Sequence, residues 1–305
     1  LNSTSGAALK NIAIGTDALT ALTTGDNNIA IGYNALDAIT DSAEQNIAIG
    51  NNAMGAAAAG VAVSNNVAIG VDAMGAGTLT AAVAGTTAVG HEALKALTSG
   101  AGNVAVGYQT LQGVTVGDNN VALGHQALYS MAGEDGNDNN IGIGSNALYT
   151  AGVSSNVATE NIGIGTNALK LNQTGDNNIA IGVSAGYAMV DCDNSIAIGT
   201  HAMLAVATDA ADGTVAIGHY ALNALTTGAG NIAIGYGALK ENEDGARNIA
   251  IGYGAMDSQQ ATGDQGTSDG SSDNIFIGYD TGGGLWADVL SSYNVGIGNY
   301  VMDAV

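Results

Sequence analysis

The chain has 305 residues, of which 47 are glycine, none is proline and 46% are hydrophobic, whereas only 10% are charged. This composition excludes a disordered chain, which lacks apolar residues, and collagen, which needs proline and a strict glycine period. Five basic residues against 27 acidic ones give a net charge of −22, which excludes nucleic acid and membranes as expected partners, because anionic surfaces are bound through clustered Lys and Arg.

The N-terminal segment begins inside a repeating unit. It runs from Leu1 and Asn2 to Asn11, starts with Leu rather than Met, and carries no visible signal peptide. The chain contains no apolar run long enough to span a bilayer. We therefore interpret the sequence as a processed or excised piece whose N-terminal end lies within a repeat.

A core of the form Asn-Ile-Ala-Ile-Gly recurs sixteen times between residues 11 and 298, and seven of the fifteen spacings are 17 residues. A unit this short cannot bury its own apolar face, but stacked units can. The sequence therefore predicts an all-β, parallel β-solenoid (a β-roll) that runs through residues 1–305, with about 17 residues per rung. The structural ladder of one rung is represented by Asn28, Ile29, Ala30, Ile31, Gly32 and Leu36.

Each rung is predicted to form a strand, a turn, a short second strand at the Ala-Leu pair, and another turn. The two Ile positions lie two residues apart and share a face, which we assign to the core. The residue between them is Ala or Gly in 15 of 16 copies, with Phe276 as the exception.

This small column and the Asn column before it lie on the face opposite the Ile pair. Uniformly small residues indicate close packing, so we expect this face to be buried against other chains around a threefold axis. The alternative is a single-chain solenoid with a flat Ala/Asn face. Stacked Asn amides are expected to hydrogen-bond along the axis.

The column after the closing glycine holds His or Tyr in many rungs. His91, Tyr108 and His125 fall on consecutive rungs and predict an exposed aromatic ladder. His91 and His125 are two rungs apart, too far to share a metal ion. Most acidic residues lie in turn-like segments rather than as a pair in a groove, and glycoside hydrolysis needs such a pair. We therefore expect no enzymatic activity.

Asp and Asn cluster in three turns, at residues 118–120, 136–140 and 191–194. Oxygen ligands in turns suit Ca²⁺, but Asp and Asn are also ordinary turn residues, and the calcium-binding nonapeptide of β-rolls is absent. We predict no cofactor, with Ca²⁺ as the one alternative. Cys192 is the only cysteine, so no intrachain disulfide forms.

The longest insertion, residues 257–273, is rich in Gly, Ser, Asp and Gln and predicts a surface loop, with a partner-contact site as the alternative. Trp286 is expected to cap the stack or to lie at an interface. The chain stops inside a repeat. We therefore expect a window of a longer fibre protein, or subunits that stack through an end-to-end interface formed by Leu1, Asn2, Tyr300, Val301 and Met302.

The segment from Thr23 to Leu36, which reads TTGDNNIAIGYNAL, resembles the repeat of phage tail-fibre proteins. Its Asn-Ile-Ala-Ile-Gly core is also similar to the head repeat of trimeric autotransporter adhesins, a left-handed parallel β-roll built from three chains. The resemblance implies a left-handed homotrimer on a virion tail or a cell surface. The unit of 17 residues is closer to the phage-type repeat.

The sequence therefore predicts the structural shaft of an extracellular fibre that supports attachment to a host or surface. Its partners would be copies of itself, together with a host surface receptor or glycan. The alternative function is a subunit of a self-polymerising extracellular filament that stacks head to tail.

Overall fold

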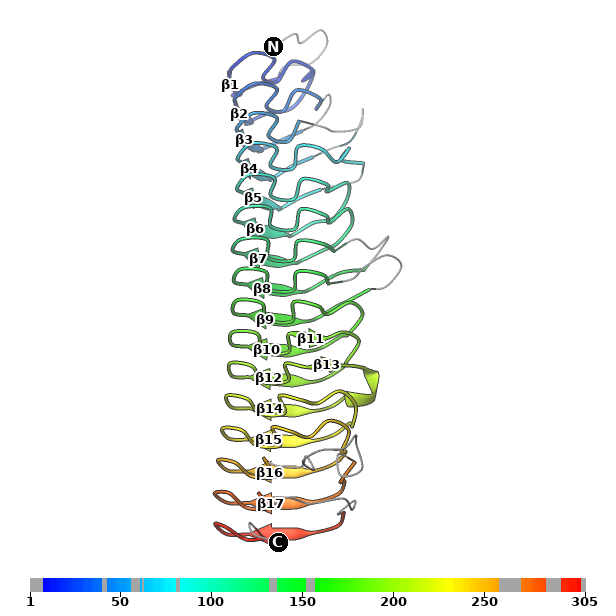
Figure 1. Ribbon diagram of the computed structural model, residues 1–305. Coiled ribbons are helices and arrows are strands. Elements are labelled where there is room, and N and C mark those ends of the chain that lie inside the picture. Colours follow the sequence, from blue (N-terminus) through cyan, green and yellow to red (C-terminus); the bar gives the residue numbers. More distant parts are fainter. Residues whose placement is uncertain are drawn as a thin grey trace. The chain divides into compact units, whose positions relative to one another are not determined.

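The computed structural model describes residues 8–39, 43–55, 61, 63–80, 83–131, 136–151, 157–257, 270–283 and 292–302. It divides into two compact units, Leu1–Thr159 and Glu160–Val305. Each unit is a coil of short parallel strands joined by turns (Figure 1), so the predicted all-β parallel β-solenoid is confirmed. Seventeen residues is the commonest interval between successive strands, and inserted residues lengthen the other turns.

The sixteen repeated strands have three residues each and coincide with the predicted Ile-Ala-Ile cores. The first unit contains β1 (Ile12–Ile14), β2 (Ile29–Ile31), β3 (Ile47–Ile49), β4 (Val67–Ile69), β5 (Thr87–Val89), β6 (Val104–Val106), β7 (Val121–Leu123) and β8 (Ile141–Ile143). The second contains β9 (Ile162–Ile164), β10 (Ile179–Ile181), β12 (Ile196–Ile198), β14 (Val215–Ile217), β15 (Ile232–Ile234), β16 (Ile249–Ile251), β17 (Ile275–Ile277) and β18 (Val295–Ile297). It also contains two shorter strands, β11 (Ala188–Met189) and β13 (Val206–Ala207), and a short 3-10 helix, η1 (Asp209–Ala211).

Strands of neighbouring repeats within a unit pair in parallel and in register. Ile29 lies beside Ile47, and Ala30 lies beside Ala48. The same register holds near the C-terminal end of the second unit, where Ile277 lies beside Ile297. Identical positions of successive repeats therefore form columns along the stacking direction, and each column has one side-chain environment.

The predicted second strand at the Ala-Leu pair is wrong, because no described Ala-Leu pair lies in a strand. Asn34 and Leu36 have φ values of 53° and 52°, in the left-handed region that a strand does not use. Their N–H groups still bond to neighbouring rungs, because Asn34 N donates to Thr16 O and Leu36 N donates to Ala53 O, both at 3.1 Å. A left-handed residue costs about 1–2 kcal/mol, and complete burial of the Leu36 side chain offsets this cost.

The glycine that closes each strand is required by the next rung. Gly32 has a φ of 138°, a conformation that residues with a side chain rarely adopt. A Cβ at this position would fall on the carbonyl oxygen of Gly50 in the neighbouring rung. Close stacking therefore excludes any side chain here.

The strand faces are the reverse of the prediction. The middle residues, such as Ala30 and Ala48, are completely buried, whereas the flanking residues Ile29 and Ile31 are only partly covered. The interior is narrow, since Leu side chains from the opposite wall already fill it. A Cβ on Gly142 would lie 3.1 Å from Cγ of Leu128. The small column thus packs inside its own chain, and the inference that this face contacts other chains is wrong.

Phe276 confirms the inward direction of the middle column. It is fully buried and stands where other rungs have Ala or Gly. Its own rung carries Gly282 at the usual Leu position, and the next rung carries Gly296 in the small column. A Cβ on Gly282 would lie 2.9 Å from Cδ1 of Phe276, and one on Gly296 would lie 2.6 Å from it. One large side chain therefore replaces the usual Leu.

The predicted Asn ladder is present, and it lies inside each unit. The Asn28 side chain donates to Oδ1 of Asn11 at 3.1 Å and to the Ala43 carbonyl at 2.8 Å. Asn46 in turn donates to Oδ1 of Asn28 through its backbone and side-chain nitrogens, both at 3.0 Å. The ladder is interrupted at Thr86 and at Thr214. Both hydroxyl oxygens are buried and have no hydrogen-bond partner among the described residues.

We predict that Phe276→Ala lowers the free energy of unfolding by about 3–5 kcal/mol, because it leaves a cavity. Gly282→Leu alone should also destabilise the protein, by about 1–3 kcal/mol, because two large groups then compete for one space. The double variant recreates the usual rung and should recover most of the loss in urea denaturation. Strictly additive effects would contradict the inward placement of Phe276.

We also predict that Asn120→Thr lowers the free energy of unfolding by about 2 kcal/mol, because buried amide groups on both neighbouring rungs lose a partner. The opposite change, Thr86→Asn, extends the ladder and should raise stability by about 1 kcal/mol. Both are measured as shifts in the urea midpoint. If Thr86→Asn destabilised the chain as much as Asn120→Thr, the ladder would not be a source of stability.

Candidate functional site

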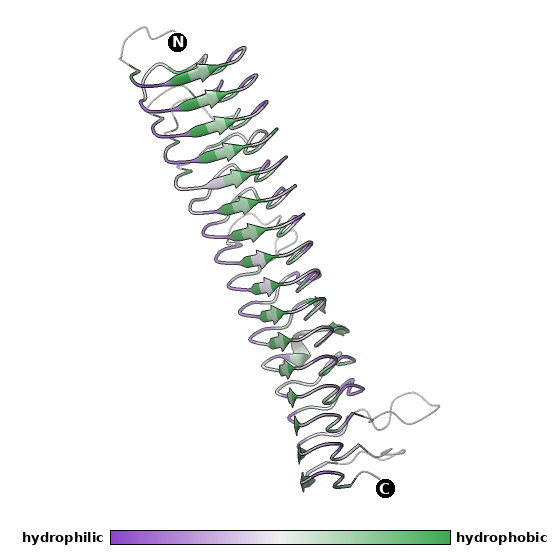
Figure 2. Cartoon of the chain, turned by 90° about the vertical axis from the view of Figure 1, so that its left-hand side faces the viewer, coloured by the Kyte–Doolittle hydropathy of each residue, from purple (hydrophilic) through white to green (hydrophobic). Residues whose placement is uncertain are grey.

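The outward face of each parallel sheet carries two columns of apolar side chains, which we call the Ile/Val face. It consists of the first and third residues of each repeated strand, and it remains partly open to solvent on every strand. Exposure is 46% at Leu123 in the first unit and 38% at Ile181 in the second. The strands appear in the green of hydrophobic residues in Figure 2.

An uncovered apolar face is unusual on a parallel sheet. Parallel sheets normally have both faces covered, and a continuous exposed apolar patch marks an interaction site in most proteins. Here eight strands in each unit each contribute two outward residues, and Thr87 is the only polar one among them. The Ile/Val face is therefore a candidate interaction surface that runs along each unit.

The predicted aromatic ladder is confirmed next to this face. His91 and Tyr108 stack with ring centroids 5.4 Å apart, and Tyr108 and His125 stack at 5.2 Å. The second unit has a second ladder, in which Tyr236 and Tyr253 stack at 4.9 Å. Tyr253 and Tyr279 continue it at 5.2 Å. Regular stacking places each ring directly over the equivalent ring of the next rung.

A polar network that the sequence analysis missed lies beside the first ladder. Glu92 accepts hydrogen bonds from Gln109 and Gln112, both at 2.6 Å, and from Lys95 at 2.5 Å. The hydrogen bond from Lys95 is the largest of the causes that lower the pKa of Glu92. Gln126 extends the network by donating to Gln109 at 2.8 Å. The sequence carries a signal for this network: Glu92, Gln109 and Gln126 each lie two residues after the closing glycine, in three consecutive rungs.

Acidic residues of the Asp/Asn clusters have a structural role. Asp138 Oδ1 accepts a hydrogen bond from the backbone N–H of Asp118 at 2.7 Å, and Asp118 Oδ1 accepts one from Ala101 at 2.6 Å. Asp193 Oδ1 likewise accepts one from Asp176 N at 2.8 Å. These carboxylates satisfy turn amides of the preceding rung. Among the described residues, no three His, Cys, Asp or Glu side chains are grouped to hold a metal ion.

The structure describes four of the remaining residues that the sequence singled out, namely Tyr300, Val301, Met302 and Cys192. Tyr300 is 61% exposed, and Met302 is exposed while Val301 is half-buried. Cys192 is buried, and its Sγ donates to Thr208 O at 3.0 Å. Leu1, Asn2, Trp286 and residues 258–269 of the long insertion lie outside the described residues.

No protein-family model matches the chain, and no curated protein matches it either. The described residues include no helix with the length and apolar character needed to cross a membrane. The surfaces that could carry a function are therefore the two described above, the Ile/Val face and the aromatic ladders. Both are suited to binding along an extended surface.

Proposed function

We propose that this chain is a structural shaft segment of an extracellular fibre, such as a phage tail fibre or a surface adhesin, and supports attachment to a host or surface. One observation carries the proposal: the Ile/Val face, which the described part of the chain covers only in part. Such a face would be an aggregation hazard unless a specific partner buries it. A second copy of the chain offers a matching face, since both have the same spacing of parallel strands.

Burial of the Ile/Val face would provide enough free energy for stable association. Complete burial of one Ile or Val is worth about 1.5–3 kcal/mol, and these side chains are already partly covered. Eight strands with two such residues each would still contribute on the order of 10 kcal/mol per unit before association costs. The resemblance to trimeric adhesin heads favours a homotrimer in which three such faces meet.

The backbone pattern suits a mechanical role. Successive rungs within a unit are joined by strand pairing, by bonds between turns, and by the buried Asn ladder. The acidic turns would keep the outer surface solvated and would repel unrelated anionic surfaces. We propose no catalytic role for any residue and an extracellular location.

The second candidate function is a filament in which subunits stack head to tail. The exposed side chains of Tyr300 and Met302 would contribute to such a contact. Electron microscopy of the purified chain separates the two candidates. Discrete particles support the shaft segment, whereas long uniform filaments support polymerisation.

We predict that the purified chain sediments as a trimer of about 89 kDa, three times 29.8 kDa, in analytical ultracentrifugation. The triple variant Ile31→Lys, Ile49→Lys and Ile69→Lys should sediment as a folded monomer, because the proposed interface would then bury three unpaired charges. Circular dichroism checks that the strand signal is kept.

The matched control places the same three charges elsewhere on the same rungs. Asn27→Lys, Gln45→Lys and Asn65→Lys lie in an exposed column that already carries Lys10 and Arg247 in other rungs. This control should keep the mass of the wild type. A wild-type chain that is monomeric at tens of micromolar, or a control that dissociates as fully as the face variant, would contradict the proposed assembly.

A further inference from the structure

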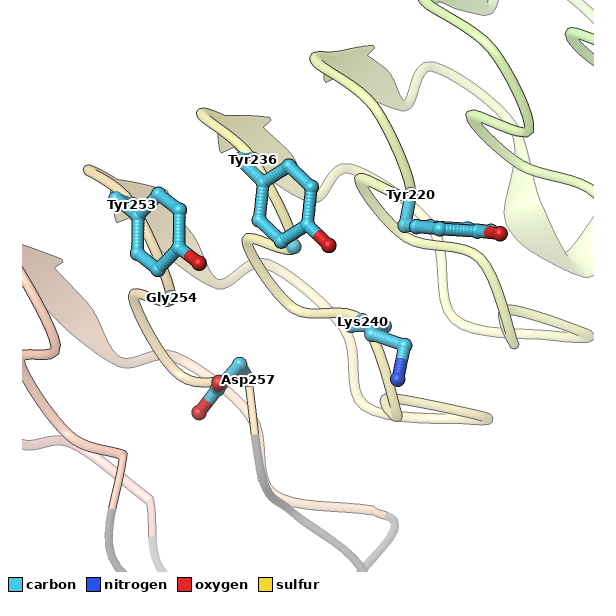
Figure 3. Close-up of a pocket in the computed structure, with 7 residues that line it drawn as sticks. Tyr220, Tyr236, Lys240, Tyr253, Gly254 and Asp257 are labelled. Carbon is cyan, nitrogen blue, oxygen red and sulfur yellow. The ribbon is translucent and has the colours of Figure 1, made fainter.

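A groove in the second unit interrupts a row of side chains. The second residue after the closing glycine is glycine in only two repeats, at Gly237 and Gly254. In all the remaining repeats this residue has a side chain, as in Asn34 and Tyr220. These two positions follow the consecutive strands β15 and β16. A Cβ on Gly237 would meet no atom within 4 Å. At Gly254 the carboxylate of Asp280 lies where a Cβ would be. The missing side chain at Gly237 helps open a cavity of about 420 Å³, which is within the usual range of ligand sites (Figure 3).

The walls of this groove differ in chemistry. Tyr236 and Tyr253 stand side by side on one wall, with their rings 4.9 Å apart and 9° from parallel. They are 46% and 49% exposed, so their edges and hydroxyls are available to a ligand. Tyr220 lies at one end, almost perpendicular to Tyr236. Lys240 and Asp257 line the opposite side.

The two charged residues give the groove both a donor and an acceptor. Lys240 Nζ lies 2.8 Å from Oε1 of Glu241, and this hydrogen bond raises the pKa of Lys240. The amine therefore stays protonated at neutral pH and donates hydrogen bonds. Asp257 comes from the equivalent position of the next rung, and its carboxylate can accept hydrogen bonds from a ligand. The tyrosine hydroxyls can both donate and accept hydrogen bonds.

We infer that this tyrosine groove binds a neutral β-linked saccharide chain; it is lined by Tyr220, Tyr236, Gly237, Lys240, Tyr253, Gly254 and Asp257. Neighbouring hydroxyls of one sugar can donate to the carboxylate and accept from the ammonium. The apolar C–H groups of the sugar can pack on the tyrosine edges. An extended β-linked chain of hexoses also advances per sugar by nearly the spacing of parallel strands, so successive sugars would meet successive rungs.

Charge disfavours anionic ligands in this groove. Asp257, Glu241 and the net charge of −22 oppose phosphates, nucleotides and anionic glycans. Lys240 already pairs with Glu241, so a cation at the same place would have to displace it from that carboxylate. A purely apolar ligand would remove water from Lys240 and Asp257 without replacing their hydrogen bonds. The biological role of the groove as an attachment point rests on the proposed function, but the binding itself does not.

The test is isothermal titration calorimetry of the full chain with three hexasaccharides of matched length. We expect cellohexaose or hexa-N-acetylchitohexaose to bind with a Kd of about 1 mM or tighter. An anionic β-linked hexasaccharide of hyaluronan should bind at least tenfold more weakly. No binding of either neutral sugar, or tighter binding of hyaluronan, would overturn the inference.

Two variants and one control locate the site. Gly237→Asn fills the groove with a residue that other rungs carry at the same backbone conformation, as in Asn34 and Asn52. This variant and Tyr253→Ala should each weaken binding at least tenfold with unchanged circular dichroism. Tyr33→Ala, in the equivalent column of the first unit, should bind as the wild type does. Binding that survives Gly237→Asn would overturn the assignment.

Sedimentation of the same samples separates this inference from the proposed function. Neither groove variant alters the Ile/Val face, so both should keep the wild-type mass. A trimer that binds no saccharide overturns the groove alone. A monomeric wild type that binds saccharide overturns the proposed assembly and leaves the groove standing.

Discussion

The narrow interior of each turn is the constraint on which the rest of the structure depends. A three-residue strand and an Ala-Leu turn face each other across this interior, and both must place a side chain in it. Since the turn contributes a Leu or Met, such as Leu36 or Met54, the strand can contribute only Ala or Gly. Phe276 fits the same interior volume because Gly282 and Gly296 stand where other rungs have larger side chains.

Two consequences follow from this constraint. The β-branched residues of each strand are directed outward, where they form the Ile/Val face. The Asn that precedes most of the repeated strands is directed inward, where water cannot reach it, and its amide must bond to the next rung. The same geometry thus produces an interior that holds successive rungs in register and an outer face of apolar side chains that are partly open to solvent.

Much of the fold could be predicted from the sequence, because in-register stacking repeats every feature at a fixed interval. The strands, the Asn ladder and the His91–Tyr108–His125 stack all follow from columns of similar residues. The direction of the two faces could not be predicted so simply. Alternation along a strand places Ile and Ala on opposite faces but does not say which of them faces inward. Because Ile is the larger apolar residue, it was assigned to the core, and this assignment was wrong.

A signal for the correct direction was present in the departures from the repeat. Phe276 in the small column coincides with a missing Leu at Gly282, which indicates that the two positions share one space. The left-handed backbone conformation of Leu36 could not be predicted from the sequence, because Gly and Asn are the residues that usually adopt it. The tyrosine groove was missed because Gly237 and Gly254 matter only when their rungs lie side by side.

Thiol labelling at two adjacent positions of one strand tests most directly which face of the sheet points outward. Ala48→Cys and Ile49→Cys would each be prepared with Cys192, which is buried, as the internal reference. We expect a maleimide reagent to label Ile49→Cys readily in dilute, dissociated protein and more slowly once the chains assemble. The same reagent should label Ala48→Cys only on unfolding. Rapid labelling of Ala48→Cys in the folded chain, with Ile49→Cys protected even in the monomer, would show that the Ile/Val face is not the outer face.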